Sequence, residues 1–187
     1  MPRLVWRVAL MAAALFVFAA HAQGFMLASP DMQDGHISEE QVYNGFGCAG
    51  KNVSPALSWS GAPLGTKSYT LIVHDPDAPT DGAGWWHWVV VDIPVDVSSL
   101  AKDAGRADGS GLPRGARQLT SDFGMPGWGG PCPPAGDNPH RYVFTLYAIK
   151  TEHLDLPKDA NASLAASMAN AQSKAKTTLT ARYGRTK

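Results

Sequence analysis

Residues 68–94 have the sequence SYTLIVHDPDAPTDGAGWWHWVVVDIP, and the rest of the chain is organised around them. An apolar run at residues 69–73 leads toward the segment Asp-Pro-Asp-Ala-Pro at 75–79. After a Gly-rich turn, a second apolar run occupies residues 85–93 and contains His87. Runs of this length, rich in Val, Ile and aromatic residues and bounded by Pro and Gly, predict β-strands. Ionisable residues therefore gather in a loop between two strands, where binding groups are commonly presented.

The composition suits one β-rich domain. The chain has 187 residues, enough for a single domain with a hydrophobic core. Its 19 Gly and 14 Pro residues predict many turns, which suits strands better than a helical bundle. Lys plus Arg equals Asp plus Glu at 16 each, so the charge balance points to neither nucleic acid nor an anionic membrane surface as a partner. The sequence leaves monomer and homodimer open.

The first 22 residues have the pattern of a secretory signal peptide. Two arginines precede an apolar run at residues 8–20, which is short for a stable membrane span. Ala20-His21-Ala22 then offers the small-x-small pattern of a signal-peptidase site. We predict cleavage after Ala22, a single mature domain at residues 23–187, a periplasmic or secreted location and no stable membrane insertion after cleavage. A membrane anchor is the alternative.

Cys48 and Cys132 are the only cysteines in the chain. An oxidising compartment permits a disulfide, and an even number of cysteines in an exported protein favours pairing. A Cys–His catalytic pair is the alternative. No Cys-x-x-Cys is present, which argues against zinc. We expect no metal and no cofactor.

Further segments predict a mainly β fold. Residues 57–60 alternate apolar and polar side chains, as a half-buried strand does, and residues 25–27 suit a short edge strand. Residues 140–149 are largely apolar on both faces, which predicts a central strand covered on both sides. Residues 162–183 are rich in Ala and free of Gly and Pro, which predicts a C-terminal helix on the sheet surface, capped by Gly184.

The loop at residues 75–79 contains the first candidate site residues. Asp75 and Asp77 are two positions apart, so in an extended segment their side chains point to the same side. The prolines between and after them stiffen the loop. We expect the two carboxylates to face one spot together with His87. The alternatives are an Asx-type turn, in which both Asp side chains cap main-chain amides, and a structural histidine in the core.

Five motifs occur in order through nearly the whole mature chain. They are Asn-Val-Ser-Pro-Ala-Leu-Ser-Trp (52–59), Asp-Pro-Asp-Ala-Pro (75–79), Trp-His (86–87), Gly-Pro-Cys-Pro-Pro (130–134) and His-Arg-Tyr (140–142). Together they resemble the phosphatidylethanolamine-binding protein family, in particular its bacterial branch of Raf kinase inhibitor-like proteins. The resemblance implies a mainly β, antiparallel, sandwich-like fold with a Greek-key element and peripheral helices, including a C-terminal helix.

The resemblance also implies a small pocket for phosphate-like anions or phospholipid headgroups. Carried over by position, its lining is Asp75, Asp77, Pro79, His87, Gly130, Pro131, His140 and Tyr142, with Trp85 at the rim. The Ala78–Pro79 bond is a candidate cis peptide, since cis bonds occur almost only before proline. The loop at residues 127–134, which belongs to a Gly/Pro-rich segment at residues 124–139 and is tied by Cys132 to Cys48, is expected to form the opposite lip.

Two carboxylates are unfavourable neighbours for a phosphate. Like charges that share a site raise at least one pKa, so we expect the Asp pair to hold a proton. That proton, or a cationic His87, would donate to the anion, and the main-chain N–H groups of residues 128–130 would add an anion-binding concavity. A zwitterion such as phosphoethanolamine would suit the site. Phosphate binding is therefore expected to tighten as the pH falls.

The leading hypothesis is an exported small-ligand binding protein that is not an enzyme, and the sequence leaves a regulatory role open. The first alternative is a protein-interaction or inhibitor module, of the kind that acts on proteases or kinases, using the pocket rim. The second alternative is a hydrolase, because Asp–His constellations also serve hydrolases. No Gly-x-Ser-x-Gly motif supplies a nucleophile, so we expect no catalytic residues.

Overall fold

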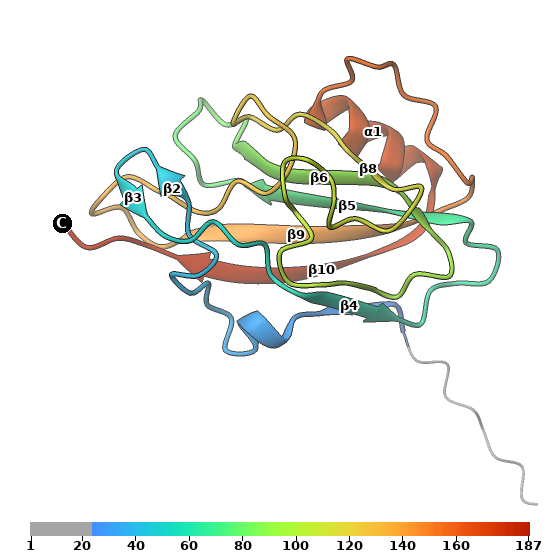
Figure 1. Cartoon of the computed structure of the whole chain (residues 1–187), viewed down its shortest axis with the longest axis horizontal. Helices are drawn as coiled ribbons and strands as arrows, with labels where there is room; N and C mark the ends of the chain where they lie inside the picture. Colours follow the sequence, from blue (N-terminus) through green and yellow to red (C-terminus); the bar gives the residue numbers. More distant parts are fainter. Residues whose placement is uncertain (1–23) are drawn as a thin grey trace, which may run out of the picture.

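The computed structural model describes residues 24–187 of the chain (Figure 1). The predicted signal peptide, residues 1–22, and its cleavage site lie outside the described residues. Within the described part, none of the helices has the length and apolar character needed to cross a membrane.

The larger sheet has five antiparallel strands in the order β10-β9-β5-β6-β8. These strands are β5 (Ser68–Asp75), β6 (Trp85–Pro94), β8 (Arg117–Gln118), β9 (His140–Ile149) and β10 (Ser173–Tyr183). The two strands predicted from residues 68–94 pair as a hairpin, and β9 returns to pair with β5 on its other side. The spatial order of β9, β5, β6 and β8 is that of a Greek key, as expected. The prediction that residues 140–149 form a central strand is also confirmed.

A smaller sheet covers one face of the larger one. It consists of β1 (Met26–Ala28), β4 (Leu57–Ser60) and β7 (Ser99–Leu100), in the order β1-β4-β7. Leu57 and Trp59 of β4 belong to the same buried cluster as Trp88 and Phe144 of the larger sheet, so the two sheets form a sandwich around one core. The remaining elements at this end of the chain are the 3-10 helix η1 (Pro30–Met32) and the hairpin β2 (Asn44–Gly45) with β3 (Cys48–Ala49).

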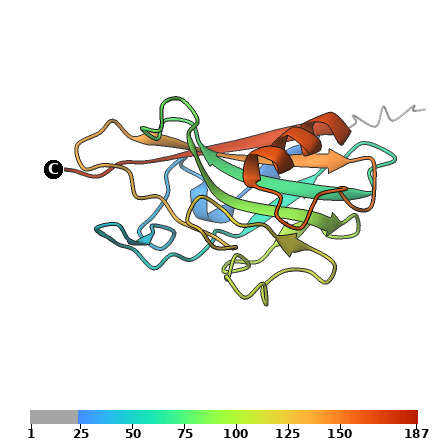
Figure 2. The same cartoon turned by 90° about the horizontal axis from the view of Figure 1, so that it is seen from above.

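Helix α1 (Ala162–Gln172) covers the opposite face of the larger sheet (Figure 2). Ala162, Ala165 and Ala169 are buried, and their spacing places them on one side of the helix. They belong to a second core cluster, together with Val89 and Val91 of β6. These small side chains let the helix approach the sheet closely. The helix lies on the surface of the sheet, as predicted.

The prediction of a helix over residues 162–183 is wrong in its second half. The helix ends at Gln172, and residues 173–183 form strand β10, which pairs with β9 along its whole length. Gly184 therefore follows a strand and caps no helix. β-Branched Thr residues in the second half favour a strand. The free edge of β9 then provides the hydrogen-bonding partner that a surface helix would leave unused.

Candidate functional site

A cavity of about 300 Å³ lies at the edge of the larger sheet where β5 ends and β6 and β9 begin. Because the strands are antiparallel, the end of β5 is the neighbour of the starts of both β6 and β9. The lining combines a few polar groups with aromatic rings and prolines. It consists of Phe46, Asp75, Ala78, Pro79, Thr80, Trp85, His87, Phe123, Cys132, Pro133, Pro134, His140 and Tyr142.

Six of the nine predicted site residues thus line one cavity: Asp75, Pro79, Trp85, His87, His140 and Tyr142. Asp77, Gly130 and Pro131 do not line it. The described residues contain no cis peptide bond, so the Ala78–Pro79 bond is trans and that expectation is wrong.

Asp75 and His140 form a buried pair in the wall of the cavity. The Nδ1–H of His140 donates to Oδ2 of Asp75 at 2.8 Å, and the two residues are only 4% and 3% exposed. The other carboxylate oxygen, Oδ1, accepts from the main-chain N–H of Asp77 at 2.8 Å. Asp75 is therefore held by hydrogen bonds at both carboxylate oxygens. It forms the Asx-type turn and also lines the cavity, so the two alternatives for this residue hold together.

Asp77 faces away from the cavity and binds Arg141. Its two oxygens accept from Nη2 and Nε of the guanidinium at 2.6 and 2.9 Å, and Oδ2 also accepts from the main-chain N–H of Arg141 at 2.9 Å. These hydrogen bonds lower the pKa of Asp77 to about 2, so this carboxyl is ionised. The expected pair of carboxylates sharing a proton is therefore not formed, because the strand that supplies His140 also supplies an arginine to Asp77.

His87 is buried, and its protonation differs from the expected cation. Nδ1 lies 2.6 Å from the carbonyl oxygen of Gly129, and a carbonyl only accepts, so the proton of the neutral ring is on Nδ1. Burial is the largest influence on this ring and lowers the pKa of His87 to about 4. At neutral pH the ring is uncharged, and its other nitrogen, Nε2, is an acceptor.

Tyr142 lines the cavity and carries a buried hydroxyl. The residue is fully buried, and its Oη has no hydrogen-bond partner within residues 24–187. Burial, followed by the nearby negative charge of Asp75, raises the pKa of Tyr142, so the hydroxyl keeps its proton. Tyr142 therefore places a protonated hydroxyl next to Asp75 in the cavity wall, without a hydrogen bond of ordinary length to any described residue.

The expected anion-binding concavity in residues 128–130 does not form. The N–H groups of Trp128 and Gly129 donate to the carbonyls of Gly105 and His87, and the N–H of Gly130 donates to Oδ1 of Asn52. All three donors of this loop are consequently occupied. A Cβ on Gly130 would clash with the carbonyl oxygen of Gln41, so this glycine permits a close approach of two main chains.

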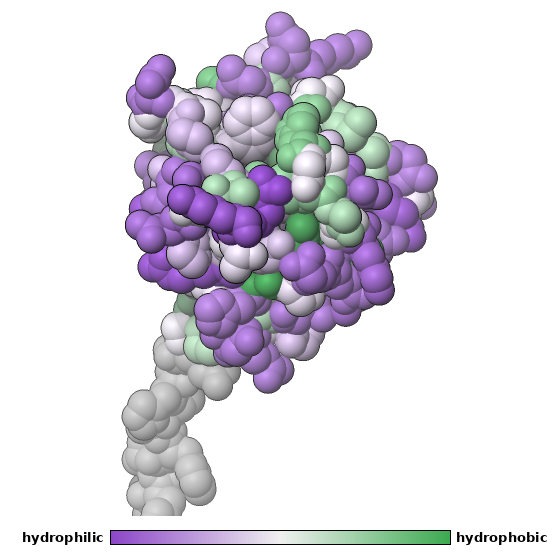
Figure 3. All heavy atoms as spheres, turned by 90° about the vertical axis from the view of Figure 1, so that its left-hand side faces the viewer, coloured by the Kyte–Doolittle hydropathy of each residue, from purple (hydrophilic) through white to green (hydrophobic). Residues whose placement is uncertain are grey.

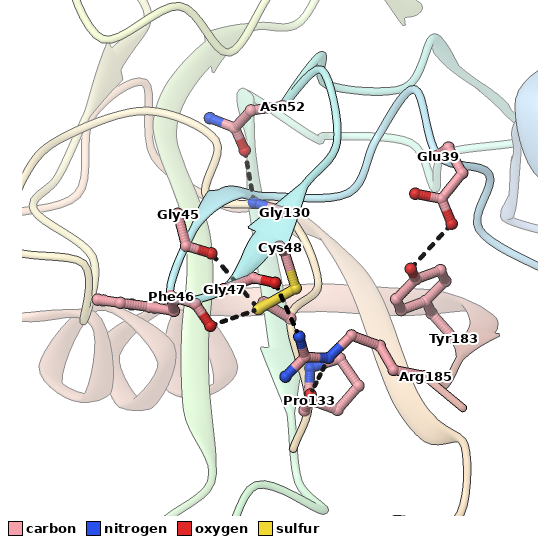
Figure 4. The surroundings of a disulfide bond; sticks show 11 residues. Glu39, Gly45, Phe46, Gly47, Cys48, Asn52, Gly130, Pro133, Tyr183 and Arg185 are labelled. Atoms are coloured by element: carbon pink, nitrogen blue, oxygen red, sulfur yellow. Dashed lines mark hydrogen bonds between the residues drawn. A yellow bond between two sulfur atoms is a disulfide. The ribbon is translucent and has the colours of Figure 1, made fainter. Parts of the chain in front are cut away.

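The disulfide between Cys48 and Cys132 is present, as predicted. It fastens the β2–β3 hairpin to the segment that carries Pro133 and Pro134 at the cavity (Figure 4). Arg185 reinforces this connection, because its Nε donates to the carbonyl of Pro133 at 2.7 Å and its Nη1 to that of Gly47 at 3.1 Å. The segment therefore forms the expected lip.

Sequence reasoning missed an aromatic part of the lining. The ring of Phe123 lies 5.6 Å from that of Trp85 and 5.9 Å from that of Phe46, which is 70% exposed. Figure 3 shows this end of the molecule, where hydrophobic side chains gather in a patch among polar ones. Neither phenylalanine lies in a motif that marked it in the sequence. Among the described residues, no group of three or more His, Cys, Asp and Glu side chains is arranged to hold a metal ion.

Comparison with known proteins places these features in a family. The family model described as phosphatidylethanolamine-binding protein matches residues 28–184. The chain belongs to the phosphatidylethanolamine-binding protein family. The resemblance predicted from the five motifs is thereby confirmed.

Individual members of this family cover most of the chain. UPF0098 protein YbcL of Escherichia coli is 47% identical over 171 residues, which is 91% of this chain and 93% of that protein. UPF0098 protein YbhB of Escherichia coli is 41% identical over 161 residues, covering 84% of this chain and 98% of that protein.

Solved structures of family members have the same fold. The crystal structure of Escherichia coli YbcL, described as a new member of the mammalian PEBP family, has a TM-score of 0.83 at 46% identity and covers 87% of this chain and 99% of its own. The family homologue CT736 from Chlamydia trachomatis has a TM-score of 0.71 at 30% identity and covers 87% and 98%.

Proposed function

We propose that the protein is an exported binding protein whose cavity holds a small ligand with a phosphate group. The Tyr142 hydroxyl is the observation that carries the proposal, because it is buried in the cavity wall without a partner. An unsatisfied buried polar group costs about 1–3 kcal/mol. A ligand oxygen that accepts from this hydroxyl would remove that cost.

The rest of the lining supports a small ligand of mixed character. The cavity volume of about 300 Å³ lies at the small end of the range for ligand pockets. The Asp75 carboxylate, already ordered by His140, suits a ligand that also carries an ammonium group, such as phosphoethanolamine. Rings and prolines on the walls suit its carbon atoms. The name of the family, phosphatidylethanolamine-binding protein, is consistent with an ethanolamine-containing ligand.

Export is supported by three separate features. The N-terminal residues have the signal-peptide pattern, and the chain uses its two cysteines in a disulfide, which is typical of oxidising compartments. A relative in Mycobacterium tuberculosis, LppC, is named a lipoprotein and is 38% identical over 148 residues, 79% of this chain.

A protein-interaction module is the second candidate. Phe46 and Met125 are 70% and 52% exposed, and Phe46 stacks with the ring of Phe123 at the cavity. Exposed apolar side chains around a pocket suit a partner surface. Hydrolysis has less support, because the hydroxyl of Thr80 donates to the Gly84 carbonyl and Cys132 is in the disulfide.

Titration calorimetry with inorganic phosphate and with phosphoethanolamine tests the proposal. We expect the wild type to bind, and Tyr142→Phe to weaken binding roughly tenfold, since a hydrogen bond to a charged group contributes about 1.5–3 kcal/mol. Tyr147→Phe is the matched control, because this tyrosine is buried in the same strand but belongs to the cluster under α1. Unchanged affinity of the Tyr142 variant would contradict the proposal. A wild type that binds neither compound would favour the interaction module.

A further inference from the structure

We infer that the cavity selects a singly protonated phosphomonoester over a phosphodiester, with His87 as the residue that discriminates between them. The inference rests on the proposed function and makes it more specific. Selection depends on the acceptor Nε2 of His87, whereas binding of the phosphate itself depends on the donor at Tyr142.

The orientation of the His87 ring is fixed by the loop that packs on it. Its Nδ1 bonds to the carbonyl of Gly129 at 2.6 Å, and the N–H of Gly129 donates back to the His87 carbonyl at 3.1 Å. The rings of Phe123, Trp128 and Tyr142 surround the imidazole, with centroids 5.4, 6.5 and 5.1 Å away. With Nδ1 occupied, Nε2 is the nitrogen left for a ligand.

Burial keeps Nε2 of His87 without a proton in the free protein at neutral pH. Burial lowers the pKa of His87 to about 4, although the Gly129 carbonyl and the Asp75 carboxylate oppose this shift. The titratable groups that border the ring are Asp75 and His74 from β5 and His140 and Tyr142 from β9. Above about pH 5 the free ring is therefore a neutral acceptor.

The hydrogen-bonding capacity of the cavity then decides between ligands. Asp75 and His87 offer acceptors, and Tyr142 offers one donor. A phosphomonoester with its second pKa near 6 carries one P–OH as the monoanion, and this group can donate to Nε2 while another oxygen accepts from Tyr142. A phosphodiester has the same single charge but no P–OH, so it either brings a lone pair against the lone pair of Nε2 or requires His87 to take up a proton, which is unfavourable above its pKa of about 4. No covalent bond changes in this recognition.

Methyl phosphate and dimethyl phosphate make the comparison at equal charge. At about pH 5 both are monoanions, and we expect the monoester to bind roughly tenfold more tightly by titration calorimetry, because the diester can bind only to a ring that has first taken up a proton about one pH unit above its pKa. The preference should shrink at about pH 8, where the monoester has lost its second proton. Equal affinity at the lower pH, or a preference that grows at the higher pH, would overturn the inference while the proposed function stands. If neither compound binds, the proposed function fails as well.

Vesicles distinguish a lipid headgroup from a free phosphate. Phosphatidic acid is a monoester and phosphatidylethanolamine is a diester, and each is presented in phosphatidylcholine vesicles at about pH 5. Binding that favours phosphatidic acid supports the inference with a lipid as the source. Binding of methyl phosphate without vesicle binding supports it with a free ligand. Binding that favours phosphatidylethanolamine contradicts it.

Long-range proton–nitrogen NMR spectra of the wild type test the tautomer without a variant. We expect His87 to carry its proton on Nδ1 in the free protein, and its Nε2 signal to move toward the protonated position with methyl phosphate but not with dimethyl phosphate. The exposed His153 provides an internal control. A free protein with the proton on Nε2 would contradict the inference. His87→Gln should abolish the preference for the monoester in the calorimetric comparison.

Discussion

His140 donates its Nδ1–H to Oδ2 of Asp75 across 2.8 Å, and both side chains are at least nine-tenths buried. The bond joins the end of β5 to the start of its neighbour β9. Because Asp75 also accepts from the N–H of Asp77, one carboxylate orders both the turn and the cavity wall. The stability of the domain and the shape of the site therefore depend on the same pair.

Asp75→Asn should destabilise the domain by about 1.5–3 kcal/mol, because it replaces a charge-assisted hydrogen bond in a buried place. Urea unfolding followed by tryptophan fluorescence measures the change. Asp96→Asn is the control, since Asp96 is exposed and outside the cavity. A free energy of unfolding equal to that of the wild type would show that the buried pair contributes nothing.

The Asp77–Arg141 ion pair should make stability depend on pH in acid. The pKa of Asp77 is about 2 in the folded protein against the usual 3.8, so the unfolded chain takes up the proton first. The stabilisation is complete above about pH 4 and is lost as the pH falls toward 2. The partners are 30% and 46% exposed, so the contribution stays below about 1 kcal/mol.

Asp77→Asn tests this pH dependence against the wild type. Unfolding by urea between about pH 2 and pH 5 should show a shallower dependence in the variant. Asp96→Asn should keep the slope of the wild type. Parallel curves for wild type and Asp77→Asn would rule out the ion pair as a source of acid sensitivity.

The disulfide should stabilise a fold that forms without it. Cys48 and Cys132 are separated by 84 residues, and a bridge that closes a loop of this size contributes about 4 kcal/mol in the chain-entropy description. Neither cysteine lies in the two sheets of the sandwich, so the Cys48→Ser/Cys132→Ser variant should retain the strand signal in circular dichroism. Its thermal midpoint should be lower than that of the oxidised wild type. Equal midpoints would contradict this, and a reducing agent should leave the variant unchanged.

Larger side chains between α1 and the larger sheet should lower the free energy of unfolding. Ala165 is fully buried against the sheet, so Ala165→Leu should cost about 1–3 kcal/mol through overpacking. Ser167→Leu adds a leucine to the exposed side of the same helix and should change stability little. Urea unfolding compares the two variants. Equal effects at both positions would show that the helix does not pack as described.

Local patterns predicted the strands of the core well. The runs at residues 68–75 and 85–94 and the segment at residues 140–149 carry their strand signal within a few neighbouring residues, in β-branched and aromatic content and flanking turns. The C-terminal strand was missed because an Ala-rich segment is compatible with a helix. Residues 173–183 are extended because they pair with the edge of β9, a strand that lies more distant in the sequence than a local pattern reaches.

Most of the predicted site residues line one cavity, whereas the shared proton of Asp75 and Asp77 and the cationic His87 were wrong expectations. Short motifs brought Asp75, His87, His140 and Tyr142 to one cavity. They carried no information about Arg141 turning to Asp77, since that contact joins residues 64 positions apart. The occupied N–H groups of residues 128–130 escaped prediction for the same reason.

The sequence by itself determined the core strands other than β10, the positions of the ionisable residues at strand ends, the cysteine pair and the family, because each depends on residue type and local spacing. The tertiary structure alone decided that His87 is a neutral acceptor, that Asp77 lies outside the cavity and that Tyr142 has a free hydroxyl. The physical reason is that a pKa and a hydrogen bond depend on burial and on atoms from distant segments, such as the Gly129 carbonyl 42 residues from His87. Those atoms come together only when the chain is folded.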